Sequence, residues 1–262
     1  MSLSSRSIFT FAMVLLASVC MIEGEAQEHA TSAAVQGSTG KLVIVAGATG
    51  RTGQHVVTEL LANGYSVRAF VRNVDEAREK LGPNIDYAEG DVRQRESVDA
   101  ALDGVTAMIC AIGSGRGDPS NGPEFVDYGG VKNLAEAATD AGLRQFVLVS
   151  SGGVTHEDHV LNKMFNNVLI WKFKGEEAVR GSGVPYTIVR PGGLMDKPSD
   201  EMKVIFQQGD EGEGMIPRAD VAKVLVRALD YPEALNKTFE VLSGENAVSG
   251  DWQSRFAALE AD

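Results

Sequence analysis

The sequence predicts an α/β fold, a doubly wound parallel sheet with helices on both faces and a small C-terminal cap. From residue 41 onward, short apolar runs alternate with segments whose apolar residues recur at helical spacing, and this alternation indicates βαβ units. The first apolar run passes directly into the glycine-rich stretch GATGRTG. A glycine-rich turn between a first strand and a first helix is typical of the Rossmann-type arrangement.

The predicted strands are short runs rich in Val, Ile and Phe. They lie at residues 41–47, 65–71, 85–91, 106–113, 144–151 and 185–191. The predicted helices between them lie at residues 53–64, 73–82, 96–104, 125–142 and 167–179. Continuous apolar strands such as LVIVA are expected where a sheet is covered on both faces.

The pattern loosens after Pro191. A strand at residues 202–207, a helix at 218–230, a strand at 237–243 and a closing helix at 251–260 remain. These elements predict a small cap over the carboxyl edge of the sheet.

The N-terminal residues have the pattern of a targeting segment. Residues 8–22 are uncharged and almost wholly apolar, and small residues place a cleavage site after Ala26. The apolar run is shorter than the ~20 residues of a membrane-spanning helix. We therefore expect a signal peptide at 1–26, a linker at 27–40 and the Rossmann-type domain at 41–262. The expected protein is exported (periplasmic, secreted or organellar) and has no stable membrane insertion after cleavage. An uncleaved anchor or a misassigned start codon, and with it a cytoplasmic location, is the alternative.

Charge and cysteine content exclude several classes of function. The net charge is −12, and an acidic chain repels phosphate backbones, so we expect no nucleic-acid partner. The two cysteines, Cys20 and Cys110, cannot build a disulfide framework or a zinc site. A small-molecule substrate is the expected partner, and the sequence leaves homodimer formation open.

The glycine-rich turn predicts a dinucleotide site. A strand must turn sharply into a helix there, and the backbone must approach a pyrophosphate that side chains would keep away. The helix N-terminus then offers free N–H groups to the phosphates. The residues expected to contact the cofactor in this turn are Gly47, Thr49, Gly50, Arg51, Thr52 and Gly53. A structural turn without a ligand is the alternative.

The end of the second predicted strand indicates NADP(H). NAD-binding chains usually place an acid there, about 20 residues beyond the glycines, on the ribose 2′-hydroxyl. This strand ends in FVRN, with Arg72 and no acid before Asp75. A guanidinium can pair with a 2′-phosphate in bidentate fashion. A solvated surface arginine is the alternative.

The motifs VIVAGATGRTG, GDV, VDYGGVKNLAEAATDAG, FVLVSS, YTIVRPGGL and IPRADVA resemble the atypical short-chain dehydrogenase/reductase family, in its NAD(P)-binding, NmrA-like and biliverdin-reductase-B-like branch. The resemblance implies an adenine site at Asp91 and Val92, and a ribose and nicotinamide wall at Ala111, Ile112 and Gly113. It also implies that Ser150 and Ser151 face the nicotinamide, and that Pro191, Gly192 and Gly193 present backbone groups to the carboxamide.

The resemblance also implies a catalytic Tyr four residues before a Lys, and here the chain departs from it. The small residue and Glu that follow favour Lys174 as this lysine, which places Ile170 at the tyrosine position. Taking Lys172 instead places Val168 there, so neither register supplies a phenol. Asp127 replaces an asparagine that is common in those branches.

Two substitutes for the missing proton donor are visible in the sequence. Ser150 or Ser151 could donate a hydrogen bond to a substrate carbonyl, unless one of them only ends the strand. His156 and His159, in the loop THEDH, could deliver a proton. The alternative for this loop is a solvated segment, and no third group that would complete a metal site lies nearby. Lys132 is expected to face solvent.

These features predict an NADPH-dependent reductase of a small redox-active acceptor such as a quinone, flavin or tetrapyrrole. The rival interpretation is a non-catalytic NADP(H)-binding sensor or assembly factor, which the missing tyrosine favours. A nucleotide-sugar epimerase is disfavoured, because the chain after residue 191 is too short for a large substrate lobe.

Overall fold

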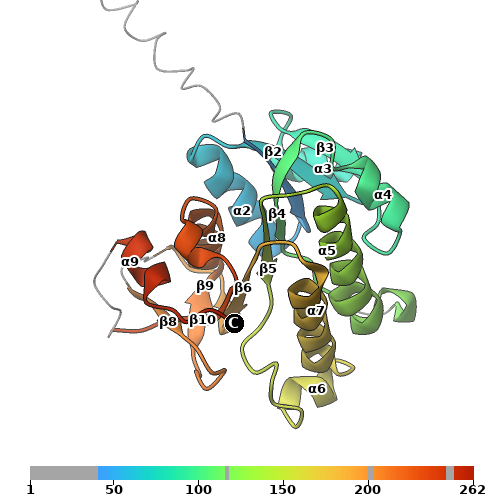
Figure 1. Cartoon of the computed structure of the whole chain (residues 1–262). Coiled ribbons are helices and arrows are strands. Elements are labelled where there is room, and N and C mark those ends of the chain that lie inside the picture. The colour runs from blue at the N-terminus through green and yellow to red at the C-terminus, as the bar shows by residue number, and fades with distance from the viewer. Residues whose placement is uncertain (1–40, 116–117, 200–202, 246–250) are drawn as a thin grey trace, which may run out of the picture. The chain divides into compact units, whose positions relative to one another are not determined.

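A mixed, mostly parallel sheet forms the centre of the computed structural model, which describes residues 41–115, 118–199, 203–245 and 251–262. Its strand order within these residues is β3-β2-β1-β4-β5-β6-β10-β8, and only β8 runs antiparallel to its neighbour (Figure 1). The strands are β1 (Leu42–Ala46), β2 (Ser66–Val71), β3 (Asp86–Glu89), β4 (Val105–Cys110), β5 (Gln145–Val149), β6 (Tyr186–Pro191), β8 (Val204–Gln207) and β10 (Lys237–Ser243).

Helices cover both faces of this sheet. On one face, α2 and α8 pack on each other, and α3 lies beside α2. On the other, α5 packs between α4 and α7 (Figure 1). The helix bounds are α2 (Arg51–Ala62), α3 (Val74–Leu81), α4 (Arg95–Ala100), α5 (Val131–Asp140), α6 (Val160–Met164), α7 (Val168–Ser182), α8 (Arg218–Ala228) and α9 (Trp252–Ala257).

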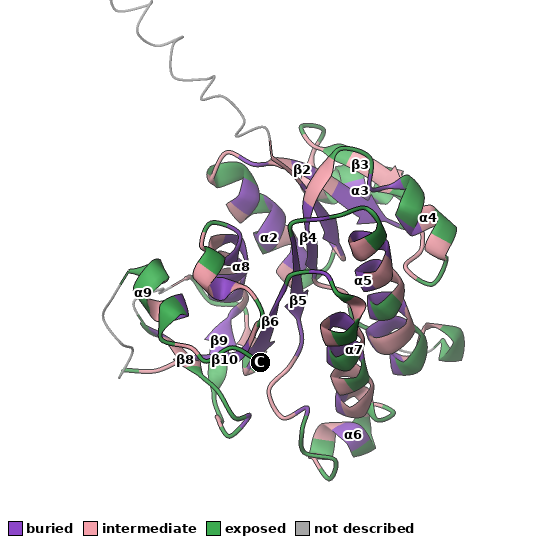
Figure 2. Ribbon diagram, viewed as in Figure 1, coloured by how far each residue is buried: buried purple, intermediate pink, exposed green. Residues whose placement is uncertain are grey.

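Side-chain alternation along β1 explains the two cores. Val43 and Val45 join the apolar cluster that includes α2 and α8, whereas Ile44 and Ala46 join the cluster that includes α5. Successive residues of a strand point to opposite faces of the sheet. All four side chains are therefore buried, and the central strands are buried along their length in Figure 2.

The strand order fixes where a ligand can bind. β1 lies between β2 and β4, so the chain reverses its direction of winding there. In open α/β sheets, the crevice outside the carboxyl ends of the strands at such a point is the usual ligand site. Two further short strands, β7 (Gly193–Met195) and β9 (Met215–Pro217), pair with each other and follow β6 at this edge.

The predicted α/β fold is confirmed, and its strands and helices lie close to their predicted bounds. The sequence did not indicate α6, the β7–β9 pair, or the π-helical geometry of residues Glu124–Gly130 (η2), which precede α5. The predicted signal peptide and linker lie outside the described residues. Within the described part of the chain, no helix is long and apolar enough to cross a membrane.

Candidate active site

The glycine-rich turn lies against the end of β4. Gly47 has a φ of +81°, and a Cβ on it would lie 2.5 Å from the carbonyl oxygen of Ala111. A Cβ on Gly53 would overlap the backbone of Gly47. Gly50 caps α2 without a side chain, so the first-turn N–H groups and the positive end of the helix dipole face the crevice. This turn fits the pyrophosphate of a dinucleotide.

A pocket of about 210 Å³ lies beside this turn. Its wall contains the residues predicted for the adenine and ribose, namely Gly47, Thr49, Gly50, Arg72, Asp91, Val92, Ala111, Ile112 and Gly113. The Arg93 guanidinium donates to both Asp91 carboxylate oxygens and to the carbonyl oxygen of Ser120. These hydrogen bonds lower the pKa of Asp91 and attach the loop that contains Ser120 to the pocket wall.

Arg72 supplies a cation at this pocket. It is exposed, directly follows β2, and has no hydrogen-bond or ion-pair partner among the described residues. The guanidinium is therefore accessible to an added anion. The first acidic residue after β2 is Asp75, which lies on α3.

A larger cleft of about 1510 Å³ continues from the glycine-rich turn over the carboxyl ends of β4, β5 and β6. It is lined by the predicted residues Arg51, Thr52, Ala111, Ile112, Gly113, Ser150, Ser151, Pro191, Gly192 and Gly193. The Arg51 guanidinium forms an ion pair with Asp196. The Ser151 hydroxyl donates to the carbonyl oxygen of Gly152 at 3.0 Å.

Ser150 differs from its neighbour. Only 6% of the residue is exposed, and its Oγ has no hydrogen-bond partner among the described residues. A buried hydroxyl without a partner is unfavourable unless a ligand satisfies it. Ser150 is thus a ready hydrogen-bond donor to a molecule bound in the cleft.

Of the two registers, the alternative one, with Lys172, is the one whose lysine lies in the cleft. Its Nζ lies 2.7 Å from Asp127 Oδ1, and Asp127 Oδ2 accepts from the backbone N–H of Ser114 at 3.1 Å. Lys172 lines the cleft. Lys174 is exposed and places its ammonium 4.1 Å from the ring centroid of Trp171. Since side chains two residues apart on a helix point in different directions, only one of these lysines can face the cleft.

Three local features bring Lys172 to this place. Asp127 lies on the π-helical turn η2, a geometry often found at functional sites. Gly175 lets α7 approach this turn, because a Cβ there would overlap the carbonyl oxygen of Asp127. The buried Asn162 side chain accepts from the N–H of Leu169 at 2.9 Å and caps the start of α7.

A buried ion network fixes the same face of α7 to the sheet. Glu176, one turn after Lys172, accepts two hydrogen bonds from Arg190 of β6 at 2.9 and 2.7 Å. Arg190 also contacts Glu240 of β10 at 3.3 Å. Burial works to lower the pKa of Arg190, but the hydrogen bonds and charge of Glu176 outweigh it and raise the pKa. The network therefore holds α7 through a charged and fully buried contact.

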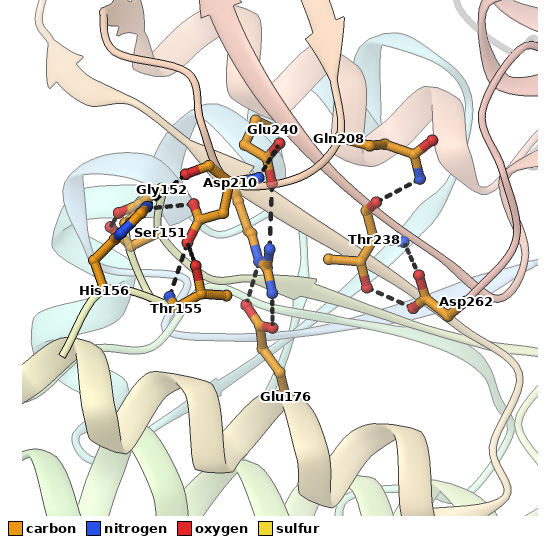
Figure 3. Close-up of polar contacts among 12 residues, drawn as sticks. Ser151, Gly152, Thr155, His156, Glu176, Gln208, Asp210, Thr238, Glu240 and Asp262 are labelled. Atoms are coloured by element: carbon orange, nitrogen blue, oxygen red, sulfur yellow. Dashed lines mark hydrogen bonds and ion pairs between the residues drawn. The ribbon is translucent and has the colours of Figure 1, made fainter.

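Asp210 connects this network to the cleft (Figure 3). Its N–H donates to Glu240 at 3.1 Å, and its carboxylate accepts from the N–H groups of Gly153 at 2.6 Å and Thr155 at 2.8 Å. Its carbonyl oxygen accepts from His156 Nε2 at 2.8 Å. Asp210 thus fixes the loop after β5 over the cleft. The sequence analysis did not identify this residue.

His156 and His159 both line the cleft. His156 Nε2 must carry the proton that the Asp210 carbonyl accepts. His159 Nδ1 accepts from the N–H of Leu161 at 3.2 Å, so the proton of its neutral ring lies on Nε2. Within the described residues no group of three or more His, Cys, Asp or Glu side chains could hold a metal ion.

The comparisons with known proteins agree with this geometry. Residues 47–232 match the family model described as NAD(P)H-binding. The chain belongs to this family of atypical short-chain dehydrogenases/reductases. A solved structure of a Bacillus halodurans protein, named as an NAD-dependent epimerase/dehydratase, superimposes with a TM-score of 0.71 at 28% identity, covering 79% of this chain and 96% of that one.

Three relatives are informative in different ways. An uncharacterized chloroplastic protein of Arabidopsis thaliana is 36% identical, over 83% of this chain and 75% of its own length. The sanguinarine reductase of Eschscholzia californica is 33% identical, over 83% of this chain and 94% of its own length. The photosystem II assembly factor Ycf39 of Trieres chinensis is 30% identical, over 78% of this chain and 64% of its own length.

Most of the residues predicted for the site do line one of the two pockets. The exceptions are Gly53, which is buried beneath the turn, and Lys174. Lys132 is exposed on α5, as predicted, with Glu136 at 3.8 Å.

Proposed function

We propose that this chain is an NADPH-dependent reductase of a small redox-active acceptor such as a quinone, flavin or tetrapyrrole. The observation that carries the proposal is the cleft wall beside the glycine-rich turn. There the buried Ser150 hydroxyl, which has no hydrogen-bond partner in the described part of the chain, lies with the Lys172–Asp127 ion pair. A sensor needs the turn and the adenine pocket, but it does not need a free buried donor beyond them. The reductase named among the relatives supports the same interpretation.

NADPH, when bound, would supply a hydride, which carries two electrons and one proton. The acceptor gains a second proton, for which the Ser150 hydroxyl and the Lys172 ammonium are the donors on the cleft wall. Asp127 holds the ammonium in place, and Ser150 orients an acceptor carbonyl. The carboxamide end of the cofactor would meet the backbone of Pro191, Gly192 and Gly193.

The preference for NADP(H) rests on Arg72. Its guanidinium lines the adenine pocket and is accessible, and one charge-assisted hydrogen bond contributes about 1.5–3 kcal/mol. That corresponds to roughly a tenfold to hundredfold gain in affinity.

A turnover screen tests the proposal. Oxidation of NADPH would be followed by absorbance with benzoquinone, a flavin and a tetrapyrrole as acceptors, for the wild type and for Ser150→Ala. We expect turnover with at least one acceptor and a loss in the variant at unchanged cofactor affinity. Tight NADPH binding without turnover of any acceptor would instead support the rival function.

The rival is a non-catalytic NADP(H)-binding sensor or assembly factor. The specific observation in its favour is that α7 carries no tyrosine one turn before Lys172. The assembly factor among the relatives agrees with it.

For location, we propose that residues 1–26 direct the chain into an organelle, as the chloroplastic relative suggests. Sequencing the mature N-terminus from fractionated cells tests this. A product that keeps Met1 in the cytoplasm would contradict it.

A further inference from the structure

A second hollow lies beside the cleft, and nothing in the proposed reaction requires it. Its volume is about 880 Å³, which is within the ~300–1,000 Å³ range of small-molecule sites. Its walls come from the loop before η2, the start of η2, the end of α6, the α6–α7 connection and the start of α7. They include Phe125, Met164, Phe165, Val168 and Trp171. We call it the apolar groove.

The apolar groove exposes side chains that proteins normally bury. Met164 is 63% exposed and Phe125 is 49% exposed. Val160, 58% exposed, lies on the same helix as Met164. Large apolar side chains that are gathered beside a pocket mark a binding surface more often than scattered ones do.

The apolar groove is continuous with the cleft. Ser114 and Phe165 line both hollows. Val168 lies one helical turn before the cleft lysine and forms part of the groove wall. A molecule whose reactive end lies near Ser150 can therefore extend past Phe165 into the apolar groove, whose wall also contains the polar residues Asp118, Glu124 and Asn166.

We propose that the apolar groove binds the unreactive part of the substrate, and that this part is a flat, apolar, fused-ring system. This inference rests on the proposed reductase function and narrows its substrate class, from small acceptors in general to polycyclic ones. Binding energy from the remote part of a substrate can hold its reactive end in place. Trp171 forms a rigid end of the wall, because its ring stacks on the ring of Tyr128, with 6.0 Å between the ring centroids, and lies beneath the Lys174 ammonium.

Trp171 also provides a test that needs no turnover. The chain has two tryptophans, so in a Trp252→Phe background the fluorescence of Trp171 reports the groove alone. The probe is phenanthrenequinone, titrated without cofactor and compared with benzoquinone. We expect saturable quenching by the three-ring quinone, and at least tenfold weaker binding of the one-ring quinone.

The double variant Phe125→Ala/Met164→Ala should weaken phenanthrenequinone binding by roughly tenfold, from the apolar area that it removes. Leu61→Ala is the matched control, because Leu61 is 42% exposed but lies on α2, away from the groove. The dissociation constant of phenanthrenequinone should be the same for Leu61→Ala as for the Trp252→Phe background protein.

The possible outcomes separate this inference from the proposed function. Equal affinity in the double variant, or equal affinity for the two quinones, would overturn the inference. Concentration-dependent self-association that the double variant abolishes, without quinone binding, would show a protein interface instead and would also overturn it. Groove binding without NADPH oxidation would refute the reductase proposal, and with it the role of the groove in holding a substrate, but would leave its preference for fused-ring molecules standing.

Discussion

Gly175 is the position where a single methyl group should damage both stability and the site. Its Cβ would overlap the carbonyl oxygen of Asp127 and would lie 3.5 Å from the Val131 side chain. In Gly175→Ala, α7 must therefore move away from η2. Overpacking of this kind lowers the free energy of unfolding by about 1–3 kcal/mol. Replacing a helical glycine by alanine raises it by up to ~1 kcal/mol. We expect a net loss of about 1 kcal/mol, or a melting temperature lower by roughly 2–4 °C.

The same helix supplies the control. Gly181 also lies in α7, and a Cβ there would meet nothing within 4 Å. Gly181→Ala should be neutral or slightly stabilising. The displacement in Gly175→Ala should also separate Lys172 from Asp127, so calorimetry should show weaker NADPH binding in that variant only. A Gly175→Ala protein that melts at or above the wild-type temperature, with normal cofactor affinity, would refute this account of the contact.

Four further predictions follow from single residues. Arg72→Ala should lose about ten- to a hundredfold affinity for NADP(H) and little for NAD(H), and calorimetry that finds equal losses would exclude a 2′-phosphate contact. Lys172→Met should weaken NADPH binding severalfold, whereas Lys174→Met should not. The reverse result would favour Lys174 as the lysine that binds the cofactor. Val168→Tyr should raise the reduction of simple ketones by less than the ~10²–10⁴-fold of a well-placed acid, whereas brisk ketone reduction by the wild type would show that another donor acts. Burial raises the pKa of the Cys110 thiol to about 12, so in the protein cleaved after residue 26 a thiol reagent should react only after unfolding. Because the folded pKa is the higher one, this thiol's contribution to stability is present below its ordinary pKa of 9.0 and is lost as pH rises toward 12.

The pocket residues that could be predicted from sequence are those whose position depends on the strand order. Gly47 and Ala111 follow adjacent parallel strands, so the fold brings them together wherever the sheet forms. Arg72 follows β2 at the same edge and could be placed for the same reason. Continuous apolar runs and a glycine-rich turn are enough to fix these positions.

The rest of the site depends on contacts that have no local signal. The choice between Lys172 and Lys174 is set by how α7 rotates, and Gly175 and the buried Glu176–Arg190 contact decide this rotation through residues far apart in sequence. Asp210 lies in a turn with a φ of +60°. Its role becomes visible only when the loop after β5 packs against it.

The alternative register connects the missing proton donor with the apolar groove. With Lys172 in the cleft, the position one turn earlier belongs to Val168, and this side chain is part of the wall of the apolar groove. The substitution that removes a phenolic proton donor therefore also extends an apolar surface up to the cleft. A ketone needs a proton as the hydride arrives, whereas a conjugated ring system spreads the added charge and depends less on a positioned donor. The same conjugated acceptors are the flat apolar molecules that the groove would bind, so under these proposals Val168 would favour one substrate class through both its binding and its chemistry.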